Sequence, residues 1–158
     1  MTPFLRMRMD LGSAPQRPAW PAGYAPRKFV LSDAAALHAL LAEAYEDGGG
    51  AIGPLSDWRP ALLGDAEFDP ALAFLAEEES TGRIAGAALC WTPGFVKDVA
   101  VARTARRRGL ASALMQAAFA AFRARGLSHV DLKVRPDNAS AIALYRSLGM
   151  YEPPPDER

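Results

Sequence analysis

Hydrophobic and polar residues alternate strictly over residues 4–11. Because successive side chains of a strand point to opposite faces of a sheet, this alternation predicts a half-buried strand. The apolar positions on one side are Leu5, Met7, Met9 and Leu11. Residues 12–26 contain four prolines, which favours an extended connection without regular structure. We therefore divide the chain into an N-terminal strand with a Pro-rich linker, residues 1–26, and a main domain, residues 27–158.

The rest of the pattern predicts strands that alternate with helices. Apolar runs predict strands over residues 27–31, 72–78, 83–91, 94–101 and 129–134. Helical spacing predicts helices over residues 33–46, 55–64, 106–125 and 138–148. Ser80, Thr81 and Gly82 form a turn that makes residues 72–91 an antiparallel hairpin. A hairpin followed by strand, helix, strand and helix indicates a single α/β (α+β) domain. Residues 48–50, three glycines, are expected to form a mobile loop.

Composition and charge exclude several functional classes. The chain has 18 basic and 18 acidic residues, and this neutral balance argues against a general nucleic-acid binder. The single cysteine, Cys90, cannot form an internal disulfide, and no Cys/His cluster has metal-ligand spacing. No segment approaches the roughly 20 apolar residues needed to span a bilayer, so we expect no membrane interaction. A cytoplasmic protein without a metal fits these observations.

Candidate chemistry begins at residues 99–113, where a short strand leads into a helix. The strand is Val99-Ala100-Val101, and the helix start reads Arg106-Arg107-Arg108-Gly109-Leu110-Ala111-Ser112. The first turn of a helix has free backbone N–H groups and a partial positive charge, so it binds phosphate well. The simpler interpretation is a capped surface helix with a solvated basic start.

The motif continues near the end of the chain with Asn138, Leu144-Tyr145 and Leu148-Gly149-Met150. Together with Val99-x-Val101 and Arg106-x-x-Gly109-x-Ala111, this arrangement resembles the GNAT superfamily of acyl-CoA-dependent N-acyltransferases. The resemblance extends from about Arg27 to Met150. It implies a single GNAT-like domain with a mixed central sheet and helices on both faces.

The resemblance also implies a donor site for acetyl-CoA. Val99, Ala100 and Val101 would offer backbone hydrogen bonds to the pantetheine arm. The turn formed by Arg106, Arg107, Arg108, Gly109, Leu110, Ala111 and Ser112 would hold the pyrophosphate on its backbone amides. Asn138 would contact the pantetheine region or act as a plain N-cap. Tyr145 would be the general acid that protonates the departing CoA thiolate or, alternatively, a core tyrosine.

The general base is less clear from the sequence. Some relatives carry a glutamate on the strand before Val99, but the matching position here is Phe95. Asp98 is the nearest carboxylate and is the tentative base, although strand alternation places it on the face opposite Val99. Glu46, Asp47 and a water chain are alternatives.

The sequence therefore predicts an N-acetyltransferase that moves an acetyl group from acetyl-CoA to an amine by direct attack. The acceptor is a small-molecule amine or a peptide, and the oligomeric state is a monomer or a homodimer. The alternative is a non-catalytic acyl-CoA-binding sensor or assembly module.

The end of the chain departs from the family pattern. Family members continue with two more strands after the last helix, whereas this chain reaches Pro153 almost at once. Residues 4–11 and the Pro-rich linker resemble the junction between the halves of tandem GNAT proteins of the mycothiol synthase type. We expect the N-terminal strand to fill the vacant place in the sheet of its own chain or of a partner.

Overall fold

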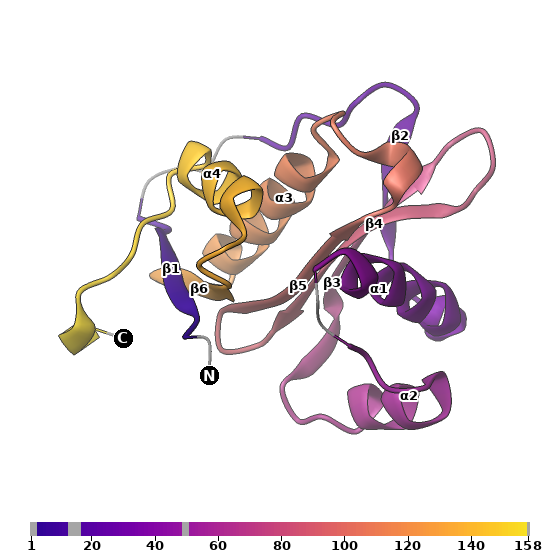
Figure 1. Ribbon diagram of the computed structural model, residues 1–158, viewed down its shortest axis with the longest axis horizontal. Helices are drawn as coiled ribbons and strands as arrows, with labels where there is room; N and C mark the ends of the chain where they lie inside the picture. The colour runs from indigo at the N-terminus through magenta and orange to yellow at the C-terminus, as the bar shows by residue number, and fades with distance from the viewer. Residues whose placement is uncertain (1–2, 13–16, 49–50, 158) are drawn as a thin grey trace.

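The computed structural model describes residues 3–12, 17–48 and 51–157. Within these residues one mixed sheet has the strand order β1-β6-β5-β4-β3-β2 (Figure 1). Its strands are β1 (Leu5–Asp10), β2 (Tyr24–Lys28), β3 (Phe68–Glu78), β4 (Ile84–Trp91), β5 (Phe95–Val101) and β6 (His129–Val134). All neighbouring strands are antiparallel except β5 and β6, which are parallel. The predicted mixed sheet and α/β class are confirmed.

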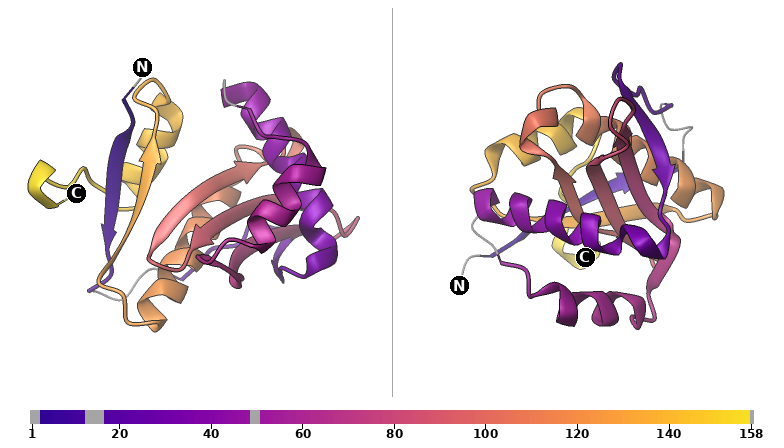
Figure 2. Two further views of the ribbon diagram at one scale, coloured as in Figure 1. Left: turned by 90° about the horizontal axis from the view of Figure 1, so that it is seen from below. Right: turned by 90° about the vertical axis from the view of Figure 1, so that its right-hand side faces the viewer.

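Helices cover both faces of the sheet (Figure 2). On one face lie α1 (Ala34–Gly48) and α2 (Leu55–Leu63), which enclose a buried cluster that includes Leu37, Leu41 and Leu89. On the other face lie α3 (Leu110–Ala124) and α4 (Ala139–Ser147), over a second cluster that includes Phe119 and Phe122. The two cores fix the sheet between layers of helices, so the loops at the strand ends are held in place.

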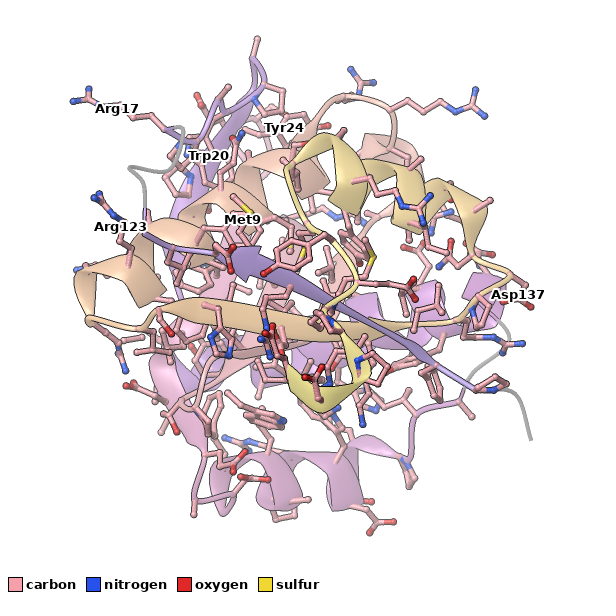
Figure 3. The ribbon with its side chains drawn as sticks, turned by 90° about the vertical axis from the view of Figure 1, so that its left-hand side faces the viewer. Met9, Arg17, Trp20, Tyr24, Arg123 and Asp137 are labelled. Atoms are coloured by element: carbon pink, nitrogen blue, oxygen red, sulfur yellow. The ribbon has the colours of Figure 1, made fainter. Side chains whose placement is uncertain are left out.

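The N-terminal strand completes the sheet of its own chain. β1 pairs with β6 from Leu5 opposite Val134 to Asp10 opposite His129. Met7 is buried in the same core as α3 and α4. The outer edge of β1 is bridged by the tail, since the Arg8 amide donates to the Tyr151 carbonyl and the Tyr151 amide donates back (2.7 and 3.0 Å). Figure 3 views this side of the molecule. The vacant place is therefore filled within the chain.

β5 separates from β6 at its centre and has an irregular register with β4 at the same point. Its pairing with β6 is limited to Phe95 opposite Asp131 and Val96 opposite Leu132. On the other side the register shifts by one residue at Lys97, which is a β-bulge. Beyond Val96 the two parallel strands diverge, and the space between them opens toward the start of α3.

Three predicted boundaries differ from the structure. β2 is Tyr24–Lys28 rather than residues 27–31, and β3 begins at Phe68 rather than residue 72. Pro26 is tolerated inside β2 because β2 is an edge strand, where a missing N–H breaks no ladder. The helix predicted from residue 106 begins at Leu110, because Arg107 and Gly109 have left-handed φ angles of 63° and 87°. Residues 49 and 50 of the expected glycine loop, and residues 13–16 of the linker, lie outside the described residues.

Candidate functional site

A cleft of about 740 Å³ lies where β5 and β6 diverge. Three segments form most of its wall: the second half of β5, the turn before α3, and the start of α4. The C-terminal part of α1 adds a fourth side. The cleft is lined by Ala44, Asp47, Val99, Ala100, Val101, Ala105, Arg106, Arg107, Gly109, Leu110, Ala111, Ser112, Arg135, Asp137, Asn138, Ser140, Ala141, Leu144 and Tyr145.

The turn before α3 presents backbone donors to this cleft. Ala105 is buried and ends a short 3-10 turn, Arg103–Ala105. Gly109 then occupies the N-cap of α3 without any side-chain cap. The first N–H groups of a helix have no partner inside the helix, and here the residues from Gly109 to Ser112 line the cleft. The side chain of Leu110 is buried against the sheet, so the first turn of α3 is anchored while its backbone faces open space.

Arginines in the cleft wall are paired with carboxylates. Arg106 Nη1 lies 2.8 Å from Asp47 Oδ2, and Arg106 Nε donates to the Val101 carbonyl at 3.1 Å. Asp47 also accepts from Arg103 Nε at 3.1 Å, and hydrogen bonds from Arg103 and Arg106 lower the pKa of the Asp47 carboxyl. Arg135 Nη2 lies 3.2 Å from Asp137 Oδ2. Figure 3 labels Asp137, in the turn that leads into α4.

The second half of β5 is paired on one side. Val99, Ala100 and Val101 lie opposite Ala88, Ala87 and Gly86 of β4. The side that faces β6 has no ladder partner beyond Val96 among the described residues. An unpaired strand edge beside a cleft offers alternating N–H and C=O groups to an extended ligand. These three residues therefore lie where the sequence motif predicted a strand-like ligand contact.

Tyr145 combines a buried ring with an accessible hydroxyl. The residue is 9% exposed and packs in the core under α3 and α4. Its hydroxyl has no hydrogen-bond partner among the described residues. Every fully buried side-chain oxygen or nitrogen among those residues does have a partner. The hydroxyl is therefore open to the cleft. Burial, and then the charge of Asp98, raise the pKa of Tyr145 to about 12, which keeps the phenol protonated at neutral pH.

Asn138 is the N-cap of α4. Its Oδ1 accepts a hydrogen bond from the Ala141 amide at 3.2 Å, and its side chain also lines the cleft. The structure thus contains the capping interaction that the sequence offered as one of two interpretations. Capping uses Oδ1 and leaves the amide nitrogen for another acceptor.

Asp98 and Arg108 are not among the residues that line the cleft. Arg108 is exposed. The carboxylate of Asp98 accepts hydrogen bonds from Tyr45 Oη at 2.5 Å and from Lys97 Nζ at 3.1 Å, and its side chain is 7% exposed. Its charge nevertheless influences Tyr145. Asp98 therefore lies outside the cleft, on the α1 side of β5, and close enough to Tyr145 for its charge to act on the phenol.

Sequence reasoning missed several cleft residues. Asp47 was considered only as a possible base, and Ala44, Arg135 and Ser140 were not singled out. The signal for Arg135 was its position just before Asn138, where a strand ends at the same edge of the sheet as β5. Nothing in the sequence pattern indicated that the end of α1 reaches the turn before α3.

Comparison with known proteins decides the family. The sequence profile of the Acetyltransferase (GNAT) family matches residues 34–150. The chain belongs to this family. A curated GNAT relative, the mycothiol acetyltransferase of Clavibacter michiganensis subsp. michiganensis, is 40% identical over 148 residues, which are 88% of this chain and 45% of the relative. The mycothiol acetyltransferase of Clavibacter sepedonicus is 38% identical over 135 residues, 80% of this chain and 42% of the relative. The chain spans about half the length of these relatives.

Solved structures agree on the fold. A GCN5-related N-acetyltransferase from Sphaerobacter thermophilus superposes with a TM-score of 0.84 at 30% identity, covering 95% of this chain and 48% of that one. A tandem GNAT protein from the clavulanic acid biosynthesis pathway superposes with a TM-score of 0.66 at 19% identity, covering 96% and 50%. The sequence-based prediction of a GNAT domain with relatives of the mycothiol synthase type is confirmed.

No helix among the described residues is both long enough and apolar enough to cross a bilayer. No group of three or more His, Cys, Asp or Glu side chains among them is placed to hold a metal ion.

Proposed function

We propose that this chain is an N-acetyltransferase that moves an acetyl group from acetyl-CoA to an amine by direct attack. The observation that carries the proposal is the convergence on one cleft of three features: free N–H groups at the start of α3, the unpaired edge of β5, and the accessible hydroxyl of Tyr145. The phosphates of acetyl-CoA need N–H donors, its amide-containing arm needs an unpaired strand edge, and the leaving thiolate needs a proton donor.

The cleft fits acetyl-CoA as the donor substrate. Its volume of about 740 Å³ lies within the range of small-molecule sites. The turn from Arg106 to Ser112 would hold the pyrophosphate, with Arg107 as additional positive charge. Val99, Ala100 and Val101 would bind the pantetheine amides, and Asn138 would contact the same arm through its amide nitrogen. We place Arg108 at the solvent side of this turn.

In the proposed reaction the nitrogen of the neutral amine attacks the thioester carbonyl carbon. A C–N bond forms, the C–S bond breaks, Tyr145 donates its proton to the leaving sulfur, and the nitrogen of the new amide gives a proton back to the Tyr145 oxygen. The amine must first lose a proton, for which Asp98 is the proposed acceptor. We propose no acyl-enzyme step through Cys90, because that thiol is buried and burial raises its pKa far above neutrality.

The proposed acceptor class is a primary amine on a small molecule or a peptide. The curated relatives are named mycothiol acetyltransferases, and two of the similar solved structures are aminoglycoside acetyltransferases. These names support an amine acceptor in general. We propose residues 27–158 as the acyltransferase domain, with residues 1–26 supplying its edge strand, and a cytoplasmic location.

A second candidate function is an acyl-CoA-binding sensor or assembly module without turnover. The observation that favours it is that Phe95 occupies the position where some relatives carry a glutamate, while the carboxylates that line the cleft, Asp47 and Asp137, are paired with arginines. In both candidates acetyl-CoA binds in the same cleft, but only the first candidate transfers the acetyl group to an amine.

Two measurements test the proposal. Acetyl-CoA at 100 times its dissociation constant should stabilise the folded protein by about 2.7 kcal/mol, which a thermal melt detects. Release of CoA thiol from acetyl-CoA in the presence of a panel of primary amines should exceed the rate without amine. Stabilisation without thiol release would favour the sensor, and no stabilisation at all would refute both candidates.

A further inference from the structure

Tyr45 connects α1 to the divergence point of β5. Its ring packs in the apolar cluster between the sheet and α1, together with Trp58 and Trp91. Its hydroxyl donates to Asp98 Oδ1 at 2.5 Å. Ala44, the preceding residue in α1, lines the donor cleft. The same turn of α1 therefore borders the cleft and holds a carboxylate beside it.

The β-bulge determines which way Asp98 points. Without the extra residue Lys97, the register between β4 and β5 would be shifted by one residue on one side of this point. The side chains of β5 on that side would then point to the opposite face of the sheet. With it, Asp98 lies opposite Leu89, which is buried in the α1-side cluster, and Val99 lies opposite Ala88, which packs on the α3 side. Opposite residues of an antiparallel pair share a face. β5 thus presents Val99 toward the α3 side and, one residue earlier, Asp98 toward α1.

The carboxylate of Asp98 retains capacity for a ligand. Tyr45 Oη binds Oδ1 and Lys97 Nζ binds Oδ2, so each oxygen uses one of its two lone pairs. Lys97 is itself 5.9 Å from the centroid of the Trp91 ring, which holds the ammonium on the outer side. An amine that approaches from the α1 side would meet a fixed, nearly buried carboxylate next to the donor cleft.

We propose that Tyr45 is a positioning residue that holds the Asp98 carboxylate for the acceptor amine, on the α1 side of β5. The inference rests on the proposed N-acetyltransferase function. In the step concerned, Asp98 takes one proton from the acceptor ammonium, the freed nitrogen lone pair forms the new C–N bond, the C–S bond breaks, and the departing sulfur takes its proton from Tyr145. The nitrogen then gives its second proton to the Tyr145 oxygen, and Asp98 loses its proton to solvent. The acceptor is accordingly an amine that arrives as a cation.

Four titratable groups surround Asp98 from the packed elements. They are Tyr45 on α1, Lys97 on β5, Cys90 on β4 and Tyr145 on α4; the last two interact with it through its charge. The donors from Tyr45 and Lys97 hold the carboxylate in one orientation, and removal of the Tyr45 hydroxyl leaves Oδ1 without its fixed donor.

The test compares Tyr45→Phe with Tyr151→Phe in steady-state kinetics at several pH values. Tyr151 also donates to an aspartate, Asp10 Oδ1 at 2.8 Å, but on the β1 side of the molecule. Tyr45→Phe should lower kcat/KM for the amine about tenfold, the equivalent of one charge-assisted hydrogen bond. It should leave the Kd of acetyl-CoA within about twofold of wild type. Tyr151→Phe should change neither.

Asp98→Asn serves as the second variant because an asparagine oxygen still accepts from Tyr45, so the packing is kept. It should lower kcat/KM for the amine about 100-fold. The double variant should be no slower than Asp98→Asn alone, since Tyr45 acts through Asp98. An unchanged kcat/KM for the amine in Tyr45→Phe, or full activity in Asp98→Asn, would overturn the inference while leaving the acetyltransferase function intact. A wild-type protein that is inactive with every amine would overturn both.

Discussion

Asp47 of α1 and Arg106 of the turn before α3 form an ion pair, with 2.8 Å between Oδ2 and Nη1, and both residues line the cleft. The pair places a negative charge beside the backbone amides that would receive the donor's pyrophosphate. Arg103 extends the contact, since its guanidinium binds Asp47 and Glu46 at 3.0 Å each. Ion pairs thus connect the end of α1 to the turn that forms part of the cleft wall.

Replacement of Asp47 by asparagine should tighten CoA binding. Asn retains an oxygen that accepts from Arg106 but removes the charge that repels phosphate, and an exposed pair of this kind is worth up to about 1 kcal/mol. The expected change in Kd is about fivefold or less at low ionic strength. Titration calorimetry with CoA measures it.

Glu46→Gln is the matched control for that variant. Glu46 binds the same Arg103 but does not line the cleft. The Kd of CoA for the Glu46→Gln variant should therefore stay at the wild-type value. High salt should reduce the gain in Asp47→Asn, because exposed charges are screened. Weaker CoA binding in Asp47→Asn would mean that its charge is needed to orient Arg106.

Tyr145→Phe should lower kcat about 100-fold while leaving the Kd of acetyl-CoA unchanged, because only a proton donor is lost. The pKa of Tyr145 is raised to about 12, and the protonated form is the active one. Wild-type kcat should therefore show no loss caused by Tyr145 between pH 7 and about pH 10. Single-turnover thiol release separates this step from product release. Equal losses in kcat and affinity would instead assign Tyr145 to binding or packing.

The ion pair between Asp131 of β6 and Arg8 of β1 should contribute strongly to the stability of the folded protein. Arg8 donates to both carboxylate oxygens of Asp131 at 2.8 and 3.1 Å, and both residues are buried. Burial alone would raise the pKa of Asp131, but hydrogen bonds from Arg8 and Arg6 hold it below its ordinary value. Arg8→Met leaves this carboxylate buried with part of its compensation removed and should destabilise the protein by about 3 kcal/mol in urea denaturation at pH 7.

The sign of the pH dependence follows from that lowered pKa. The contribution of the pair is present above the unfolded-state pKa near 4 and is lost as pH falls through the lower folded-state pKa. The difference between wild type and Arg8→Met should shrink from pH 7 to pH 3. A difference that stays constant over this range would show that Arg8 acts by packing rather than by charge.

Gly94→Ala should destabilise the turn between β4 and β5. Gly94 has φ +99°, and a Cβ there would lie 2.7 Å from Leu127 Cδ2 and 3.1 Å from the His129 carbonyl oxygen. Strain and overlap together should cost about 2 kcal/mol, seen as a Tm lower by about 4–8 °C. Gly12→Ala, where a Cβ meets nothing within 4 Å, is the control and should leave the Tm unchanged.

Local pattern was sufficient to predict much of the fold. Alternation over residues 4–11 predicted β1, and the glycines after α3 and α4 predicted where those helices end. The start of α3 was misplaced because Arg107 adopts a left-handed φ that arginine propensity does not indicate. The edge strand β2 was misplaced because a proline usually argues against a strand, and only the sheet order shows that it lies at an edge.

The lining of the cleft was predictable where it is local in sequence. Most of the predicted residues between Val99 and Ser112 line the cleft, and they lie within one short segment whose spacing can be read directly. Tyr45 and Asp98 are 53 residues apart and come together because α1 packs against β5. Asp47 and Arg106 are likewise far apart in the sequence, and no local pattern predicts their contact.

The pairing of β1 with β6 also determines the order in which the protein can be completed. Arg6 and Asp131, which contact each other at 2.8 Å, are 125 residues apart in the chain. During synthesis the segment of β1 emerges from the ribosome before β6, which follows only after four other strands and three helices. At about 5–20 residues per second, that interval is about 6–25 seconds. Throughout it the apolar side of β1 lacks its partner strand, and the start of α4, which lines the cleft, is made later still.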